Sequence, residues 1–165
     1  SSHNGEPGHL RVAASILAKA GNTEACYECG AHWPHERKDV IDLARAGEEP
    51  RAIHNNCSGK HAGMLAHCVQ QQWVTNGYHK ATHPMQQRVV STLARWMRVD
   101  ANDLESGIDG CGLPTFVVPL DAVATGCAKF AAAVADGHQV FSQQLGQPCR
   151  LEKVKAVGLV GELFD

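Results

Sequence analysis

Apolar residues recur at helical spacing along most of this chain, and this periodicity restricts the fold to one in which helices predominate. We expect five helices, over about residues 10–20, 35–46, 56–73, 84–96 and 121–134. Gly21 and Gly47 are placed to end the first two, and Pro84 suits the first turn of the fourth. Asn56 or Ser58 can cap the third.

The same spacing predicts which side chains the helices bury. In the second helix, Val40, Ile41 and Ala44 share the inward face. Cys68 and Cys127 fall on the apolar stripes of the third and fifth helices, where a thiol packs like a small hydrophobic side chain. We therefore assign these two cysteines to the core.

Strand signals are few. Residues 115–118 give the clearest strand, which the chain enters through a glycine-rich turn at residues 109–114. Residues 51–54 give a weaker strand, and residues 154–159 begin another. No internal repeat or long linker interrupts the pattern, so we expect residues 1–165 to form a single domain.

Three short segments place reactive side chains at turns or helix entries. The first is Asn55-Asn56-Cys57-Ser58-Gly59-Lys60-His61-Ala62-Gly63-Met64-Leu65-Ala66, and the second is Gly107-Ile108-Asp109-Gly110-Cys111-Gly112-Leu113-Pro114. The third, Ser1-Ser2-His3-Asn4-Gly5-Glu6, opens the chain. Together they supply two thiols, an amine, a carboxylate, imidazoles and hydroxyls at positions that present side chains rather than bury them.

In this order, the three segments resemble the asparaginase II family, the rhizobial-type cysteine-bearing amidohydrolases. The resemblance implies an α/β serine β-lactamase-like fold, of which this chain would be the helix-rich middle portion with few strands. It also implies an enzyme that hydrolyses L-asparagine to L-aspartate and ammonia and that forms a homodimer. Because the chain lacks an initiator Met and stops after the apolar residues 157–161, we expect an incomplete internal fragment of a longer protein.

Ser2 matches, through this resemblance, one serine of the family's two Ser-Lys pairs and is the predicted catalytic residue. A serine hydroxyl becomes a nucleophile when a neighbouring base, such as a neutral lysine, takes its proton. Neither partner lysine matches a position here: one belongs to an upstream Ser-x-x-Lys, and the other lies beyond Asp165. We therefore expect the fragment alone to be inactive.

Cys57 and Lys60 stand three residues apart at a helix entry, so their side chains lie on neighbouring positions of one face. From the spacing alone, they form either part of a metal site or a helix start with a buried thiol and a solvated lysine. The resemblance assigns Cys57, Lys60 and Cys111 to a metal site, described as zinc. Three protein ligands leave a fourth position for water or substrate.

His61 and Asp109 flank these predicted ligands and are the predicted substrate-binding residues. His61 can bond the site or a substrate carboxylate, and Asp109 can hold a substrate ammonium or orient a metal ligand. The alternatives are a surface histidine on a helix and an aspartate that forms a turn.

A second cysteine and histidine cluster competes for a metal. Cys26, Cys29, His32 and His35 recur every three residues, although a structural zinc site normally separates its ligand pairs by a longer loop. Residues 29–34 of this cluster also resemble a block of the asparaginase II family to which we assign no metal role. His79 and His83 have helical spacing between turn signals, which predicts a surface position.

Composition excludes several classes of function. The net charge of −2 without a run of Lys or Arg leaves no electrostatic footprint for nucleic acid. No apolar stretch reaches the roughly 18 residues of a membrane span, and no phosphate-binding glycine loop indicates a nucleotide cofactor. Seven cysteines, an odd number with uneven spacing, favour a reducing compartment and hence the cytoplasm.

Two other functions stay open at this point. One is a serine hydrolase of the β-lactamase or penicillin-binding type, which shares the expected fold and needs no metal. The other is a non-catalytic metal-binding or redox-sensing module built on the cysteines. The sequence does not separate a preference for asparagine from one for glutamine.

Overall fold

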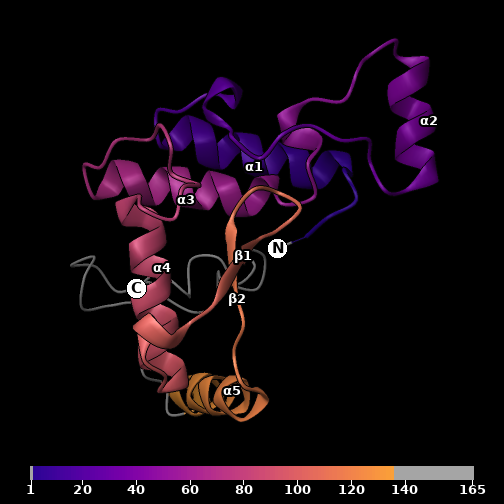
Figure 1. Cartoon of the computed structure of the whole chain (residues 1–165). Coiled ribbons are helices and arrows are strands. Elements are labelled where there is room, and N and C mark those ends of the chain that lie inside the picture. The colour runs from indigo at the N-terminus through magenta and orange to yellow at the C-terminus, as the bar shows by residue number, and fades with distance from the viewer. Residues whose placement is uncertain (1, 136–165) are drawn as a thin grey trace. The chain divides into compact units, whose positions relative to one another are not determined.

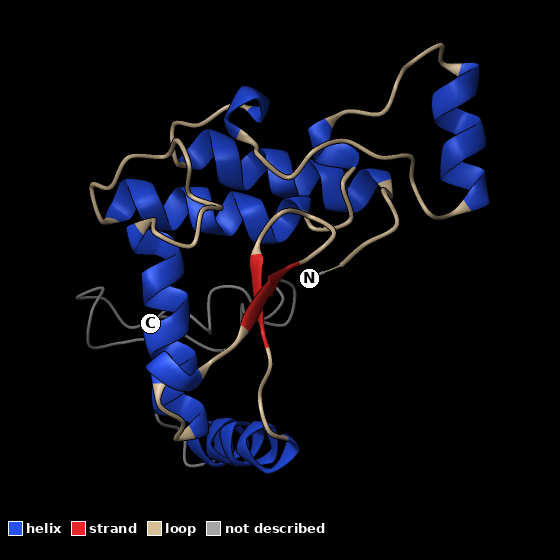
Figure 2. Cartoon of the chain, viewed as in Figure 1, coloured by secondary structure: helices blue, strands red, loops and turns tan. Residues whose placement is uncertain are grey.

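The computed structural model describes residues 2–135, in which helices predominate (Figures 1 and 2). Its α-helices are α1 (Pro7–Lys19), α2 (Arg37–Arg45), α3 (Ser58–Gln70), α4 (Pro84–Met97) and α5 (Leu120–Ala135). Strands β1 (Ser106–Ile108) and β2 (Pro114–Phe116) pair in a two-stranded sheet, and the single-turn 3-10 helices are η1 (Glu24–Cys26), η2 (Ala52–His54) and η3 (Ala101–Asp103). The prediction of a helix-rich chain with few strands is confirmed for these residues. The serine β-lactamase-like fold stays a prediction.

The chain divides into two compact units. The first, which we call the site unit, comprises residues 1–86 and 108–114, and the second, the C-terminal unit, comprises residues 87–107 and 115–165. The prediction of a single domain over residues 1–165 stays a prediction. Residues 154–159, the third expected strand, lie outside the described residues.

The core of the site unit forms where α1 packs against α3, which run side by side in Figure 1. Ala13 and Leu17 of α1 are buried, and α3 contributes Ala62, Leu65 and Cys68. Their separations of three and four residues place them on one face of each helix. The predicted core position of Cys68 is confirmed, and Gly21 follows α1 with a φ of +72°, a conformation that glycine adopts without strain.

Helix α2 forms close to its predicted range, but the prediction of its inward face is wrong. None of its residues is buried in the structure, and Ile41 and Ala44 are exposed. Helical spacing shows which side chains share a face, but it does not show whether another element covers that face.

The predicted strand at residues 51–54 is also wrong, because this segment closes into the 3-10 helix η2. The backbone N–H of His54 donates to the carbonyl oxygen of Arg51 at 2.9 Å. In return, the Arg51 N–H donates to Nδ1 of His54, also at 2.9 Å. These reciprocal bonds satisfy the backbone locally, so the segment needs no partner strand.

In the C-terminal unit, the second half of α4 contacts α5. The prediction that Cys127 of α5 belongs to the core is wrong. Ala122 and Gly126 of α5 are buried, whereas Cys127 is exposed. A Cβ atom at Gly126 would lie 3.2 Å from Cγ of Met97, so the small residue marks the close approach of the two helices. The buried stripe therefore follows the small side chains rather than the most apolar ones.

None of the helices between residues 2 and 135 combines the length and the apolar character that crossing a membrane requires.

Candidate functional site

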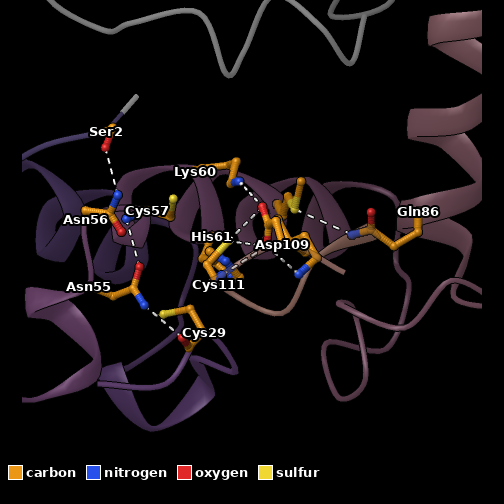
Figure 3. Close-up of polar contacts among 12 residues, drawn as sticks. Ser2, Cys29, Asn55, Asn56, Cys57, Lys60, His61, Gln86, Asp109 and Cys111 are labelled. Atoms are coloured by element: carbon orange, nitrogen blue, oxygen red, sulfur yellow. Dashed lines mark hydrogen bonds and ion pairs between the residues drawn. The ribbon is translucent and has the colours of Figure 1, made fainter. Parts of the chain in front are cut away.

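Asn55 fixes the entrance to α3. Its side chain is almost fully buried, and Nδ2 donates to the carbonyl oxygens of Cys29 and Gly30 at 2.8 and 3.2 Å. Its Oδ1 accepts the backbone N–H of Cys57 at 2.8 Å (Figure 3). Cys57, the residue that precedes α3, is thereby held against the segment around Cys29, and Lys60 follows in the first turn of the helix.

Asp109 organises the turn that carries Cys111. Its Oδ1 accepts the backbone N–H groups of Cys111 and Leu113 at 3.0 and 2.9 Å, and the Cys111 thiol donates to the same oxygen at 3.1 Å. Burial opposes ionisation of this carboxyl, but the bonds from Cys111 and Leu113 and the charge of Lys60 outweigh it and lower its pKa. Asp109 is therefore a carboxylate whose lone pairs hold the turn.

The two segments meet through Lys60, whose Nζ lies 3.3 Å from Oδ2 of Asp109 (Figure 3). Burial lowers the pKa of Lys60, but Cys111, Cys57 and Asp109 together outweigh burial and raise it. Burial and the neighbouring Asp109 raise the pKa of the Cys111 thiol. Lys60 is thus the centre of an electrostatic cluster that the predicted ligands Cys57 and Cys111 and the carboxylate of Asp109 complete. The ligand atoms of Cys57, Cys111 and Asp109 do not all lie within 4.8 Å of one another.

His61 lies beneath this cluster in the protein interior, not on the helix surface. Its side chain is fully buried, and Nδ1 lies 2.6 Å from the hydroxyl of Tyr78, which accepts the backbone N–H of Glu28. Nε2 is buried and has no hydrogen-bond partner among the described residues. Burial and the neighbouring Lys60 charge lower the pKa of His61 to about 4.

We expect His61 to make the metal-free intact protein less stable below neutral pH. The unfolded chain binds a proton at this ring as the pH falls below 6.5, whereas the folded protein does so only near pH 4. The free energy of unfolding therefore falls across that window, by about 3 kcal/mol for this group. Urea unfolding of wild type and His61→Asn at several pH values measures the difference in slope.

Asparagine keeps a polar partner for Tyr78 but does not titrate, so the variant should lose less stability than wild type between pH 6.5 and 4. His3 and His54, whose pKa values burial also lowers, remain in both proteins. The difference between the two slopes therefore isolates His61, and parallel slopes would contradict this account.

Ser2 lies against the entrance of α3 and is exposed. The Asn56 side chain donates through Nδ2 to Ser2 Oγ at 2.8 Å, and the carbonyl oxygen of Asn56 accepts the backbone N–H of His3 at 3.0 Å (Figure 3). Nε2 of His3 bonds Ser58 Oγ at 2.9 Å. The opening segment is thus joined to residues 56–58, next to the predicted metal ligand Cys57.

The competing cysteine and histidine cluster is engaged in other contacts. Cys29 donates from its thiol to the carbonyl oxygen of Ala52, and His32 bonds the Trp33 carbonyl oxygen and Asn56. Among the described residues, three or more ligand atoms of His, Cys, Asp or Glu lie within 4.8 Å of one another only at His3, Glu6 and His9.

That group is accounted for by local structure. His3 bonds Ser58 through Nε2 and accepts the Gly5 N–H at Nδ1, and Glu6 Oε2 accepts from the Asn4 N–H and contacts His9 Nδ1. These bonds shape the turn that leads into α1, so the group needs no ion to satisfy its polar atoms.

The predicted surface position of His83 is wrong. Its ring is buried, with Nε2 bonded to the Val74 carbonyl oxygen at 2.9 Å and Nδ1 accepting the Met85 N–H at 3.0 Å. His79 is half-buried and contacts Glu28 Oε2 at 2.6 Å. Both rings therefore hold the loop that precedes α4.

Sequence reasoning missed the roles of Asn55, Asn56 and Tyr78. The two asparagines lie inside the segment from 55 to 66, and their proximity to Cys57 is the signal that could have found them. Tyr78 stands alone between turn residues, and no spacing connects it to His61.

A comparison with known protein families identifies the family to which this chain belongs. Residues 1–150 match the family model described as L-asparaginase II, and this range contains the three segments and every site residue described above. No curated protein matches the chain. Because the match covers most of the chain, the protein belongs to the L-asparaginase II family.

Proposed function

We propose that the intact protein is an amidohydrolase that converts L-asparagine to L-aspartate and ammonia. Membership of the L-asparaginase II family supports the reaction class. The observation that carries the proposal is the position of Ser2, which Asn56 joins to the α3 entrance beside Cys57. A nucleophilic hydroxyl and a cluster of thiol, amine and carboxylate groups then belong to one site.

Ser2 is the proposed catalytic serine. Its Oγ accepts a hydrogen bond from Asn56, so the hydroxyl hydrogen is left for a base. A neutral lysine of the intact protein would take that proton as Oγ bonds the amide carbon. Protonation of the nitrogen releases ammonia, and water then hydrolyses the ester to give aspartate and restore the hydroxyl.

The cluster fits a zinc ion in its donor chemistry. Cys57 and Cys111 offer thiolates, and Lys60 offers an amine once its proton is lost. Asp109 accepts hydrogen bonds from the Cys111 thiol and from Lys60, as expected of a residue that orients metal ligands. When bound, zinc would act as a Lewis acid and a positive charge beside the substrate. We propose that Cys57, Lys60 and Cys111 hold it.

Asp109 and His61 complete the proposed site in different ways. Asp109 already bonds Lys60 and the Cys111 turn, which supports an orienting role and leaves capture of the substrate ammonium as the alternative. The buried Nε2 of His61 supports a bond to the site, to water or to a substrate carboxylate. The homodimer and the cytoplasmic location also belong to this proposal.

The deciding experiment is to incubate the intact protein with L-asparagine and to measure ammonia and aspartate together. We expect equimolar ammonia and aspartate from asparagine, and a parallel assay with glutamine measures the preference between the two amides. Acylation of Ser2 by a β-lactam, with activity unchanged after chelation, would instead indicate a hydrolase of the penicillin-binding type. A folded, metal-loaded protein that releases no ammonia would indicate a metal-binding module and would refute the proposed function.

A further inference from the structure

The segment at residues 29–34 supplies a side chain to the surroundings of Ser2. His32 belongs to this segment and lies 24 residues before Asn56 in the sequence. Its Nδ1 bonds the carbonyl oxygen of Trp33 at 2.7 Å. Its Nε2 lies 3.0 Å from the backbone nitrogen of Asn56 and 3.1 Å from Oδ1 of the same residue.

The hydrogen on Nε2 decides which of these contacts is a hydrogen bond. Because a carbonyl oxygen only accepts, the bond to Trp33 places a hydrogen on Nδ1. An unprotonated Nε2 then accepts the Asn56 N–H, and a protonated Nε2 donates to Asn56 Oδ1. In both states, the ring bonds Asn56.

Asn56 connects this ring to the serine. Its backbone is held on one side by His32 and on the other by the His3 N–H, which donates to the Asn56 carbonyl oxygen at 3.0 Å. Its side chain spans from His32 to Ser2 Oγ, at 3.1 and 2.8 Å. Ser2 is exposed, and an exposed serine hydroxyl is otherwise free to exchange among three rotamers.

We propose that His32 is a positioning residue for Ser2 and that it acts through Asn56. This inference rests on the proposed function, since it assigns Ser2 the catalytic hydroxyl. A reacting atom displaced by about 1 Å can cost about a hundredfold in rate. The His32 ring contacts Asn56 and not Ser2 itself, so its loss should displace the serine, lower kcat and leave KM nearly unchanged.

The intact protein with His32→Gln or His32→Asn tests this role. Glutamine brings its amide to the place of Nε2 and can still bond Asn56, whereas asparagine reaches only the place of Nδ1 and keeps only the Trp33 bond. We expect His32→Asn to lower kcat for asparagine about 10- to 100-fold, with KM within about threefold of wild type. His32→Gln should recover kcat to within about threefold of wild type.

A second readout does not depend on activity. The side-chain NH₂ signals of Asn56 in an NMR spectrum should shift in His32→Asn and return toward their wild-type positions in His32→Gln. His35→Asn is the matched control, because His35 is an exposed neighbour, with its ring centroid 4.9 Å from that of His32, and is not part of the link to Ser2. It should leave both kcat and the Asn56 signals unchanged.

Equal kcat losses in the Gln and Asn variants would overturn the proposal, because the bond to Asn56 would then not matter. Unchanged kcat and unchanged Asn56 signals in His32→Asn would overturn it as well. If wild type releases no ammonia while the Asn56 signals follow the expected pattern, the proposed function fails and the link from His32 through Asn56 stands.

Discussion

Replacing Ser2 by alanine in the intact protein should lower kcat for asparagine hydrolysis by at least about a thousandfold, because the group that bonds the amide carbon is removed. The fold should survive, since Ser2 is exposed and alanine removes only the hydroxyl that accepts from Asn56. KM should change much less than kcat. Steady-state ammonia release, with circular dichroism to verify folding, measures the effect.

Ser15→Ala is the matched control, because Ser15 is an exposed serine on α1 of the same unit. It should keep full activity. Should Ser2→Ala retain more than about a tenth of wild-type kcat, Ser2 would not be the attacking group, and the catalytic serine would have to be sought elsewhere in the intact protein.

Replacing Cys57 and Cys111 together by serine should remove most of the bound metal. Serine hydroxyls stay protonated where thiols ionise, so the site loses its two soft ligands and retains only Lys60. We expect the zinc content to fall from about one ion per chain to below about a tenth, and KM for asparagine to rise at least about tenfold. Elemental analysis of the purified proteins, followed by kinetics, checks both.

Cys127→Ser serves as the control, because Cys127 is an exposed thiol on α5 and outside the proposed site. Its metal content and kinetics should match wild type. A double variant that kept a full zinc complement would show that the metal is held elsewhere, and one that lost zinc with unchanged KM would separate the metal from substrate binding.

The features that could be predicted from the sequence are those that depend on residues close together in the chain. Apolar spacing, glycine stops and Pro84 placed the helices, and the Cys57 and Lys60 spacing marked an unusual helix entrance. Burial depends on contacts between segments, and spacing does not record them. Helix α2 therefore has no buried residue within the described part of the chain despite its pattern, and on α5 the small Gly126 rather than Cys127 faces Met97.

In the site, too, local features were predicted and contacts between distant residues were not. Its reactive groups were visible because they cluster in short segments, but the groups that hold them come from far along the chain. Ser2 and Asn56 are 54 residues apart, and His32 and Asn56 are 24 apart. Neither separation has a period that a pattern search detects, and only folding brings His61 under the cluster to meet Tyr78.

The adjacency of Asn55 and Asn56 limits how this family member can vary in length. One asparagine holds the backbone of Cys29 and Gly30, and the next holds Ser2, so both anchors and Cys57 share a fixed spacing. One residue inserted here would separate the two anchors, or the second anchor and Cys57, by a further step of about 3.8 Å between Cα atoms. Insertions and deletions that preserve function should therefore fall in α2 and its flanks, residues 35–50, where no residue is buried.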